Sequence, residues 1–90
     1  MMDAVKQWQV VIDIDEHDNR TRAVARLRTQ DTDKLTGVGL ARRNPADQDV
    51  PGIGDELAAA RALSELSHNL LDAAATDIEK ITHRPAHLHM

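Results

Sequence analysis

The first half of the chain alternates apolar and polar residues, which is the pattern of strands that bury one face. Three such segments occur, at about residues 7–14, 20–29 and 35–42. The polar runs between them, DEHDN and QDTDK, are typical of turns. The pattern therefore predicts a three-stranded antiparallel sheet.

The apolar residues of the first two segments suggest a register. Pairing Ile12 with Ala23 keeps the apolar positions of both strands on one face, with residues 16–19 as the loop. The same pairing sets Asp13 against Arg22 on the opposite face.

The third segment alternates glycines with larger apolar residues. Pairing Leu27 with Val38 puts Val38 and Leu40 on the apolar face. Gly37 and Gly39 are then expected on the other face, beside the arginines of the second strand, which they would leave uncovered.

The second half of the chain has helical periodicity. Residues 43–54 hold two prolines and two glycines and predict a crossover loop, and Asp55 is the expected N-cap. The positions expected to face the sheet are Leu57, Ala60, Leu63, Leu66 with Ser67, Leu70 with Leu71, and Ala74. The outer positions are Arg61, Glu65, His68 and Asp72. These positions predict one amphipathic helix at about residues 55–82, packed on the sheet in a single α+β domain.

This helix is long for the sheet beneath it. About 28 residues of helix span ~42 Å, whereas strands of eight or so residues span ~27 Å. Thr76 and Glu79 have the spacing of a capping box, so either the helix breaks near Ala75 (βββαα) or it continues (βββα) and packs on a second subunit. Pro85 is expected to end the helix, and residues 84–90 to form a flexible tail.

Composition limits the core. The chain has 90 residues, Trp8 is its only aromatic residue and thirteen of its residues are alanine. A chain of this size buries only about 60–65% of its unfolded surface, and few large side chains are present to fill the interior. Burial shared with a second copy, in a homodimer, is the expected remedy.

Other compositional features bear on location. The sequence has no cysteine, which excludes disulfides and thiolate metal sites and fits a reducing compartment. Its first residues lack the apolar run of a signal peptide, and no stretch reaches the eighteen or so apolar residues of a membrane span. We expect a cytoplasmic protein that does not associate with membranes.

Charge is unevenly spread along a chain whose net charge is −4. Residues 1–43 carry eight Lys or Arg against seven Asp or Glu, whereas residues 44–90 carry three against eight. Four arginines fall at alternate positions of the second strand and so share one face, and two more end the third strand. The candidate polyanion-binding residues are Arg20, Arg22, Arg26, Arg28, Arg42 and Arg43.

The role of these arginines has more than one interpretation. Guanidinium groups bind phosphates bidentately, so the stripe could follow a nucleic-acid backbone. Alternatively, the arginines pair with Asp13 and other carboxylates, or their face forms a subunit interface or docks an acidic protein.

Other candidate chemistry is weak. Pro85 lies between His83 and the other two histidines, His87 and His89, so these residues cannot form a pair of metal ligands on one helix. The acidic turn, which comprises Asp13, Asp15, Glu16 and Asp18, lacks the residue order of a calcium-binding loop. The glycine pairs are too short for a nucleotide fingerprint, and Ser64, Ser67 and His68 do not form a nucleophile and base. We expect no enzyme activity, metal, cofactor or small-molecule substrate.

Three stretches, VVIDIDEHDNRTRAVARLR, GVGLARRNPADQDVPGIGDELAAARALSEL and THRPA, resemble a family of small actinobacterial proteins of unknown function. The resemblance covers roughly residues 7–87, and the family includes mycobacterial proteins induced under hypoxia and dormancy. It implies a cytosolic homodimer with a double-stranded-RNA-binding-domain-like sheet and helix, similar to ribosome hibernation promoting factors.

Together, these features predict a stress- or dormancy-associated homodimer that binds ribosomal or other structured RNA through its arginines. The alternative is a protein-interaction module whose arginine-bearing face forms the dimer interface or docks an acidic protein.

Overall fold

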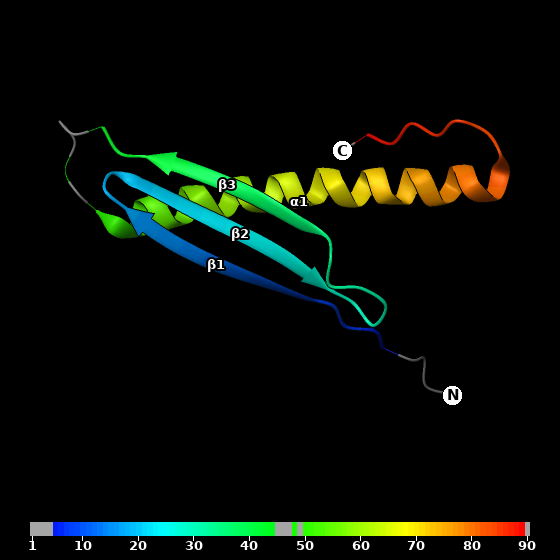
Figure 1. The fold of residues 1–90 in the computed structure, drawn as a ribbon, viewed down its shortest axis with the longest axis horizontal. Helices are drawn as coiled ribbons and strands as arrows, with labels where there is room; N and C mark the ends of the chain where they lie inside the picture. The colour runs from blue at the N-terminus through cyan, green and yellow to red at the C-terminus, as the bar shows by residue number, and fades with distance from the viewer. Residues whose placement is uncertain (1–4, 45–47, 49, 90) are drawn as a thin grey trace.

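The computed structural model describes residues 5–44, 48 and 50–89. It contains three strands, β1 (Gln9–His17), β2 (Arg20–Arg28) and β3 (Thr36–Arg42), and one helix, α1 (Pro51–Thr82). The strands form an antiparallel sheet in the order β1-β2-β3, and α1 crosses one face of it (Figure 1). The predicted α+β class, in its βββα form, is confirmed.

The first hairpin is tighter than predicted. Ile12 lies opposite Ala25 rather than Ala23, and Asp15 rather than Asp13 lies opposite Arg22. β1 continues to His17, because Asp18 adopts a left-handed conformation (φ 55°) that closes the turn with few residues. The shift is two residues, so each side chain still faces the predicted side.

The predicted register of β3 is wrong by an odd number of residues. Gly37 lies opposite Ala25 and Gly39 opposite Ala23, so both glycines face α1. Val38 and Leu40, expected in the core, lie on the face away from the helix and are 37% and 60% exposed. The face of β3 that packs against α1 therefore carries Gly37 and Gly39 instead of the larger apolar residues.

Close contact between backbones explains this register. A Cβ atom on Gly37 would overlap the backbone of Ala62 and Leu66, and one on Gly39 would overlap the backbone of Ala58 and Ala62. Only glycine allows a helix to lie this near a strand. The glycines therefore place α1 directly on β3.

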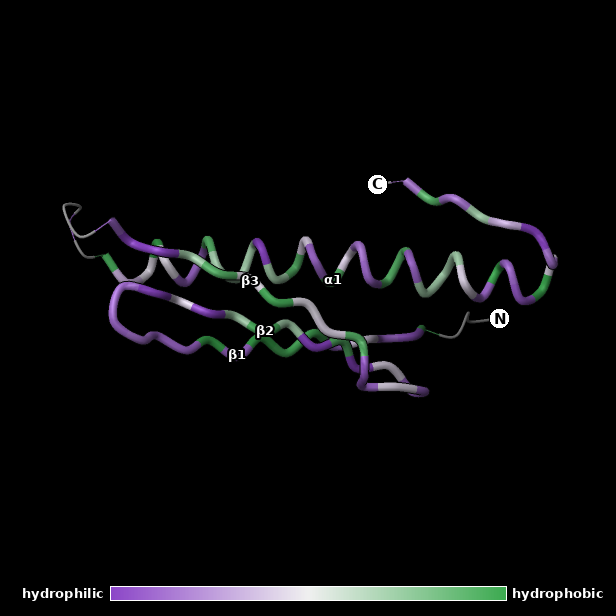
Figure 2. Tube along the Cα trace, turned by 45° about the horizontal axis from the view of Figure 1, so that its top comes forward, coloured by the Kyte–Doolittle hydropathy of each residue, from purple (hydrophilic) through white to green (hydrophobic). Residues whose placement is uncertain are grey.

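The side of α1 that faces the sheet differs from the predicted side. The predicted inner residues Leu57 and Leu63 remain 45% and 40% exposed. The side of α1 on the sheet carries smaller residues, and the apolar segments of the strands gather beneath it (Figure 2). The core consists of Ala23, Ala25, Leu27, Ala41, Ala58, Ala62 and Leu66.

The start of α1 differs from the sequence expectation, whereas its end at Thr82 agrees with it. The helix begins at Pro51 after the N-cap residue Val50, so Asp55 lies inside the helix and is not its cap. Proline suits this first turn because its missing N–H is not needed there. The helix is continuous past Ala75 and ends at Thr82. The N–H of the C-cap residue His83 donates to the Glu79 carbonyl (2.8 Å) before Pro85 is reached.

The C-terminal segment turns back along the helix (Figure 1). The Ala86 N–H donates to Oε1 of Glu79 over 2.9 Å.

Among the described residues, no helix is both long enough and apolar enough to cross a bilayer.

Three side chains of α1 close the outer edge of β3. Arg61 Nη1 donates to the Leu40 carbonyl (2.6 Å), and Asn69 Nδ2 donates to the Thr36 carbonyl (2.7 Å). Between them, the Val38 N–H donates to the Glu65 carboxylate. Arg61 and Glu65, predicted to face outward, instead satisfy an unpaired strand edge, which removes a site for unwanted strand pairing.

The contact between β3 and α1 predicts a strong effect of one methyl group. Gly39→Ala forces the helix away from β3, and this overpacking is expected to cost about 1–3 kcal/mol, which lowers Tm by about 4–24 °C. Thermal unfolding followed by circular dichroism at fixed protein concentration measures the change. The matched control is Gly52→Ala, where nothing lies within 4 Å of the added atom and no loss of Tm is expected. Equal Tm values for both variants would contradict the contact.

Candidate nucleic-acid interface

The alternate arginines of β2 lie on the face of the sheet that α1 does not cover. The other side chains of β2, Thr21, Ala23, Ala25 and Leu27, are buried toward the helix. Because successive side chains of a strand point to opposite faces, the arginines project together on the far side. All four are exposed: Arg20, Arg22, Arg26 and Arg28.

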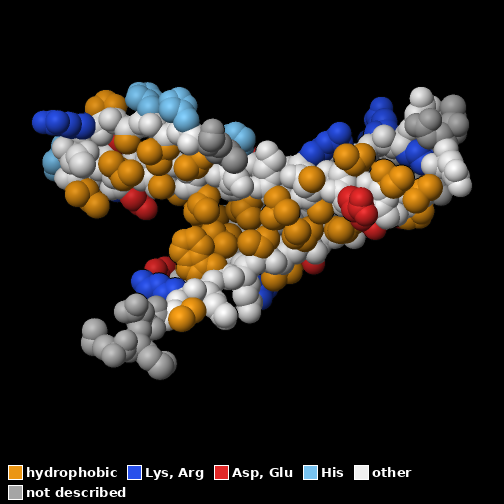
Figure 3. Space-filling model, turned by 180° about the vertical axis from the view of Figure 1, so that it is seen from behind, with side chains coloured by type: hydrophobic (Ala, Val, Ile, Leu, Met, Phe, Trp, Pro, Cys, Tyr) orange, Lys and Arg blue, Asp and Glu red, His pale blue; other side chains and the backbone are white. Residues whose placement is uncertain are grey.

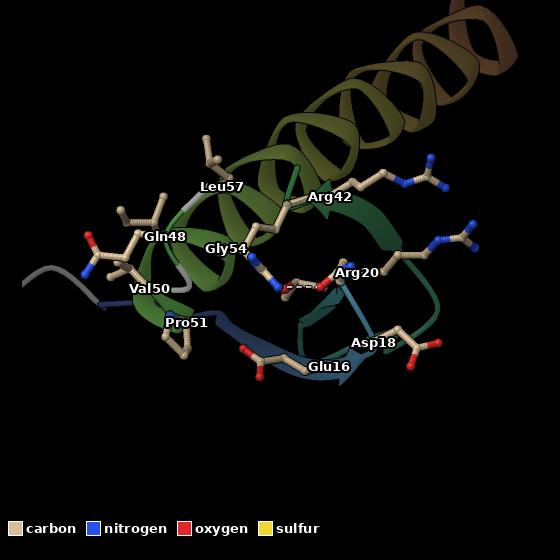
Figure 4. A pocket seen from close by; sticks show the side chains of 14 residues that line it. Glu16, Asp18, Arg20, Arg42, Gln48, Val50, Pro51, Gly54 and Leu57 are labelled. Atoms are coloured by element: carbon tan, nitrogen blue, oxygen red, sulfur yellow. Dashed lines mark hydrogen bonds between the residues drawn. The ribbon is translucent and has the colours of Figure 1, made fainter. Parts of the chain in front are cut away.

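Arg42 joins this row from β3. It lies opposite Arg20 in the sheet, and the two side chains extend in the same direction from the hairpin end (Figure 4). We call these five exposed residues and the surface around them the arginine face.

The neighbouring strands complete the arginine face. β1 contributes Val11, two aspartates and His17, and β3 contributes Val38 and Leu40. Five arginines thus stand against Asp13 and Asp15, which makes this a positive surface on a chain of net charge −4. The glycines expected beside the arginines lie on the opposite face, and exposed apolar side chains take their place.

The guanidinium groups of the arginine face are not taken up by carboxylates. An ion contact within 4.0 Å joins His17 and Asp18 (3.6 Å), both strongly exposed, and it involves none of these five arginines. Asp15 lies opposite Arg22 in the register, yet the two make no such contact. Pairing with Asp13, considered from the sequence, does not occur either. The arginines of this face therefore keep their hydrogen-bond donors for a ligand or water.

Arg43, the sixth predicted residue, has a different role. Its Nη2 donates to Oδ1 of Asn19 (2.6 Å), and its backbone N–H donates to the Asn19 carbonyl (2.8 Å). These bonds fasten the β1–β2 turn to the end of β3. Arg43 is half-buried and supports the hairpin end rather than the exposed row.

A cavity of about 390 Å³ lies between this hairpin end and the start of α1 (Figure 4). Its helix side is apolar, with Val50, Ile53 and Leu57, and its hairpin side carries Glu16 and Asp18 beside arginines. Arg20 and Arg42 lie at its rim and extend away from it (Figure 4). The cavity is therefore adjacent to the arginine face and is not its centre.

Carboxylates and histidines do not converge on a metal site in the described residues, where no group of three such side chains could hold an ion. The acidic turn shows why. Asp13 and Asp15 lie on the arginine face, Glu16 on the opposite face, and Asp18 in the turn itself.

The apolar members of the arginine face, Val24, Val38 and Leu40, were not among the site residues predicted from the sequence. Val24 lies between Arg22 and Arg26 with the same parity, so the alternation already places it beside them. Val38 and Leu40 could be assigned to this face only once the helix contact of the glycines was known.

Comparison with known proteins assigns the chain to a family. The sequence profile of the Rv2632c-like family matches residues 6–87. The chain belongs to the Rv2632c-like family. This family of small uncharacterized proteins, with members in mycobacteria, agrees with the actinobacterial family expected from the quoted stretches.

Relatives in Mycobacterium tuberculosis match over most of their length. The uncharacterized protein MT1780 (strain CDC 1551 / Oshkosh) is 56% identical over 84 residues, covering 93% of this chain and 88% of the relative. The uncharacterized protein Rv2632c (strain ATCC 25618 / H37Rv) is 52% identical over 80 residues, covering 89% and 85%.

The fold agrees with an experimental structure. The crystal structure of Rv2632c superposes with a TM-score of 0.82 at 49% sequence identity, covering 94% of this chain and all of that chain. The comparisons thus establish family and fold, and the function is argued from the residues of this chain.

Proposed function

We propose that the protein binds structured RNA through the arginine face. The observation that carries the proposal is the row of five exposed guanidinium groups, none of which lies within ion-pair distance of a carboxylate in the described residues. Guanidinium groups bind phosphate oxygens through two parallel hydrogen bonds, which favours an RNA backbone as the ligand.

The geometry of the row suits contact with phosphates rather than with bases. Alternate residues of a strand are about 6.7 Å apart, and the row from Arg20 to Arg28 is about 27 Å long. Trp8, the only aromatic residue of the chain, is not part of this face. Proteins that read single-stranded bases stack them on aromatic side chains. We therefore expect recognition of charge and shape with little sequence preference.

The biological setting belongs to the same proposal. A sheet with one helix-covered face and one basic face supports the comparison with double-stranded-RNA-binding domains and ribosome hibernation promoting factors. On this view the protein acts in the cytoplasm during stress or dormancy, and ribosomal RNA is its principal target.

A second function is favoured by the apolar side chains of the arginine face. Leu40 is 60% exposed and Val38 37% exposed, and both lie next to arginines. Apolar side chains among cations also suit an acidic protein partner. This candidate differs from the first in its ligand and not in the surface used.

Reversing charge in the middle of the row tests RNA binding. For about four neutralised phosphates, the logarithm of affinity should fall against the logarithm of salt with a slope of about −3 to −4. Arg26→Glu combined with Arg28→Glu is expected to weaken binding more than tenfold and to reduce the magnitude of the slope by about 2. Fluorescence anisotropy with a labelled RNA duplex at several salt concentrations measures both quantities.

The matched control is Lys80→Glu combined with Arg84→Glu, which changes the net charge equally at the far end of α1. This control is expected to retain nearly all affinity. A salt-insensitive interaction, or equal loss in both double variants, would remove the arginine face as the RNA site.

Removing the aspartates of β1 should have the opposite effect. Asp13→Asn combined with Asp15→Asn removes two negative charges from the arginine face, and exposed charges each contribute about 0.2–1 kcal/mol. RNA affinity is expected to rise about 2- to 30-fold in the same anisotropy measurement. The equivalent change on the helix, Asp72→Asn combined with Asp77→Asn, should raise affinity less. A larger effect from the helix pair would place the RNA on α1.

Co-sedimentation tests the target. The protein is expected to pellet with ribosomes from starved cells at low salt and to be released as salt rises, because the contact is electrostatic. The variant with Arg26→Glu and Arg28→Glu should stay in the supernatant. If the wild type binds an acidic protein but neither ribosomes nor an RNA duplex, the second function replaces the first.

A further inference from the structure

The folded chain exposes far more surface than its mass requires. A compact monomer of 10.0 kDa exposes about 5,200 Å², whereas this chain exposes 7377 Å². Its radius of gyration is 17.0 Å, against about 12 Å for a compact chain of this length. The excess of roughly 2,000 Å² exceeds the ~800 Å² that each partner buries in a standard protein interface.

Exposed apolar side chains lie between β1 and α1. The helix packs on β3 and β2 and scarcely touches β1. Trp8, just before β1, is 56% exposed, and Val10 and Ile14 on β1 are 43% and 40% exposed. Figure 3 shows hydrophobic side chains gathered where the sheet and helix meet.

The helix supplies the other wall of this region. Leu63 is 40% exposed, and Leu70 packs only partly against the core. Helical geometry places both on the flank opposite Arg61, which contacts the β3 edge, and so on the side toward β1. We call this region the apolar strip, and its members are Trp8, Val10, Ile12, Ile14, Leu63 and Leu70.

The edge of β1 beside the apolar strip is open. The Leu27 N–H donates to the carbonyl of Leu35, the residue just before β3. The backbone groups of Leu27 therefore point toward β3, and those of alternate residues such as Arg26 point toward β1. Their partners are the odd-numbered residues of β1. The N–H and C=O groups of Val10, Ile12 and Ile14 therefore point away from the sheet, and in the described residues no strand pairs with them.

We propose that β1 pairs antiparallel with β1 of a second copy of this chain, forming a six-stranded sheet that joins the two apolar strips. An antiparallel pair related by a two-fold axis presents the same surface from both sides, so one open edge is sufficient for a closed dimer. The β3 edge is already closed by Arg61, Glu65 and Asn69, which leaves β1 for this contact.

The charges of β1 select the register. A two-fold axis at Val11 pairs the outward backbone groups of both copies and sets each carboxylate against a donor. A register centred on Asp13 would instead oppose two aspartates, which is destabilising. The pairs formed across the axis at Val11 are Asp13 with Gln9, Asp15 with Gln7, and Glu16 with Lys6.

Dimer formation on this edge does not depend on RNA binding. It leaves the arginine face uncovered, because the apolar strip is on the opposite face of the sheet. Both arginine faces then lie on the same side of one continuous sheet, with the two α1 helices on the other side.

Size-exclusion chromatography with light scattering tests the interface. The wild type is expected at twice the chain mass of 10.0 kDa. Val10→Lys introduces a charge on a side chain that is already 43% exposed in one chain, so it should dissociate the dimer while preserving the circular dichroism spectrum. The matched control is Leu40→Lys, on the arginine face, which should remain dimeric. A monomeric wild type, or dissociation by Leu40→Lys and not by Val10→Lys, would overturn the proposal.

A single cysteine tests the register, because the chain has none of its own. Val11→Cys lies on the two-fold axis at a non-hydrogen-bonded pair, where Cα atoms are about 4.5 Å apart, and should form an intermolecular disulfide under mild oxidation. Leu40→Cys, although more exposed, should not cross-link. A dimer that dissociates with Val10→Lys but fails to cross-link at position 11 would overturn this register.

Discussion

The contact of two glycines with one helix governs this structure. Gly37 and Gly39 let the backbone of α1 rest on β3, at a distance that excludes any Cβ atom. This contact fixes which face of β3 packs, and it thereby sends Val38 and Leu40 to the arginine face. It also holds α1 to one side of the sheet, so that β1 is left largely uncovered.

The two edges of the sheet differ for the same reason. With α1 held on β3, Arg61, Glu65 and Asn69 are one turn apart and reach alternate backbone groups of that strand. No equivalent cover reaches β1 from the helix. A small, alanine-rich core is the result, in which the large buried apolar side chains among the described residues are Leu27 and Leu66. The apolar groups that would complete a core in one chain lie exposed beside the open edge.

The sequence predicts the strands and the arginine row well, because both depend on a period of two that any extended segment must follow. The two-residue error in the first hairpin therefore left the arginines on the predicted face. The register of β3 could not be obtained in this way. Hydrophobicity favours burying Val38 and Leu40, whereas the structure buries glycines because a helix backbone is their partner.

The predicted functional residues divide along the same line. Arg20, Arg22, Arg26 and Arg28 follow from strand alternation, and Arg42 lies with them because it pairs with Arg20. Arg43 comes directly after β3, and it donates two hydrogen bonds to Asn19 in the β1–β2 turn. These bonds depend on how the turn lies against the end of β3, which the local sequence pattern does not indicate. The helix start was misplaced for a related reason: Pro51 and Gly52 suggest a loop, yet proline is well tolerated in a first helical turn.

Positive and negative charges lie on opposite sides of the molecule. Over residues 51–82, six carboxylates stand against Arg61 and Lys80, whereas the opposite face of the sheet carries five arginines against two aspartates. A polyanion is therefore repelled from the helix side and attracted to the sheet side, although the whole chain has a net charge of −4. Net charge alone would argue against RNA as a ligand. Separation of the charges by the sheet removes that objection, since screening in salt limits the influence of the helix carboxylates to about 10 Å.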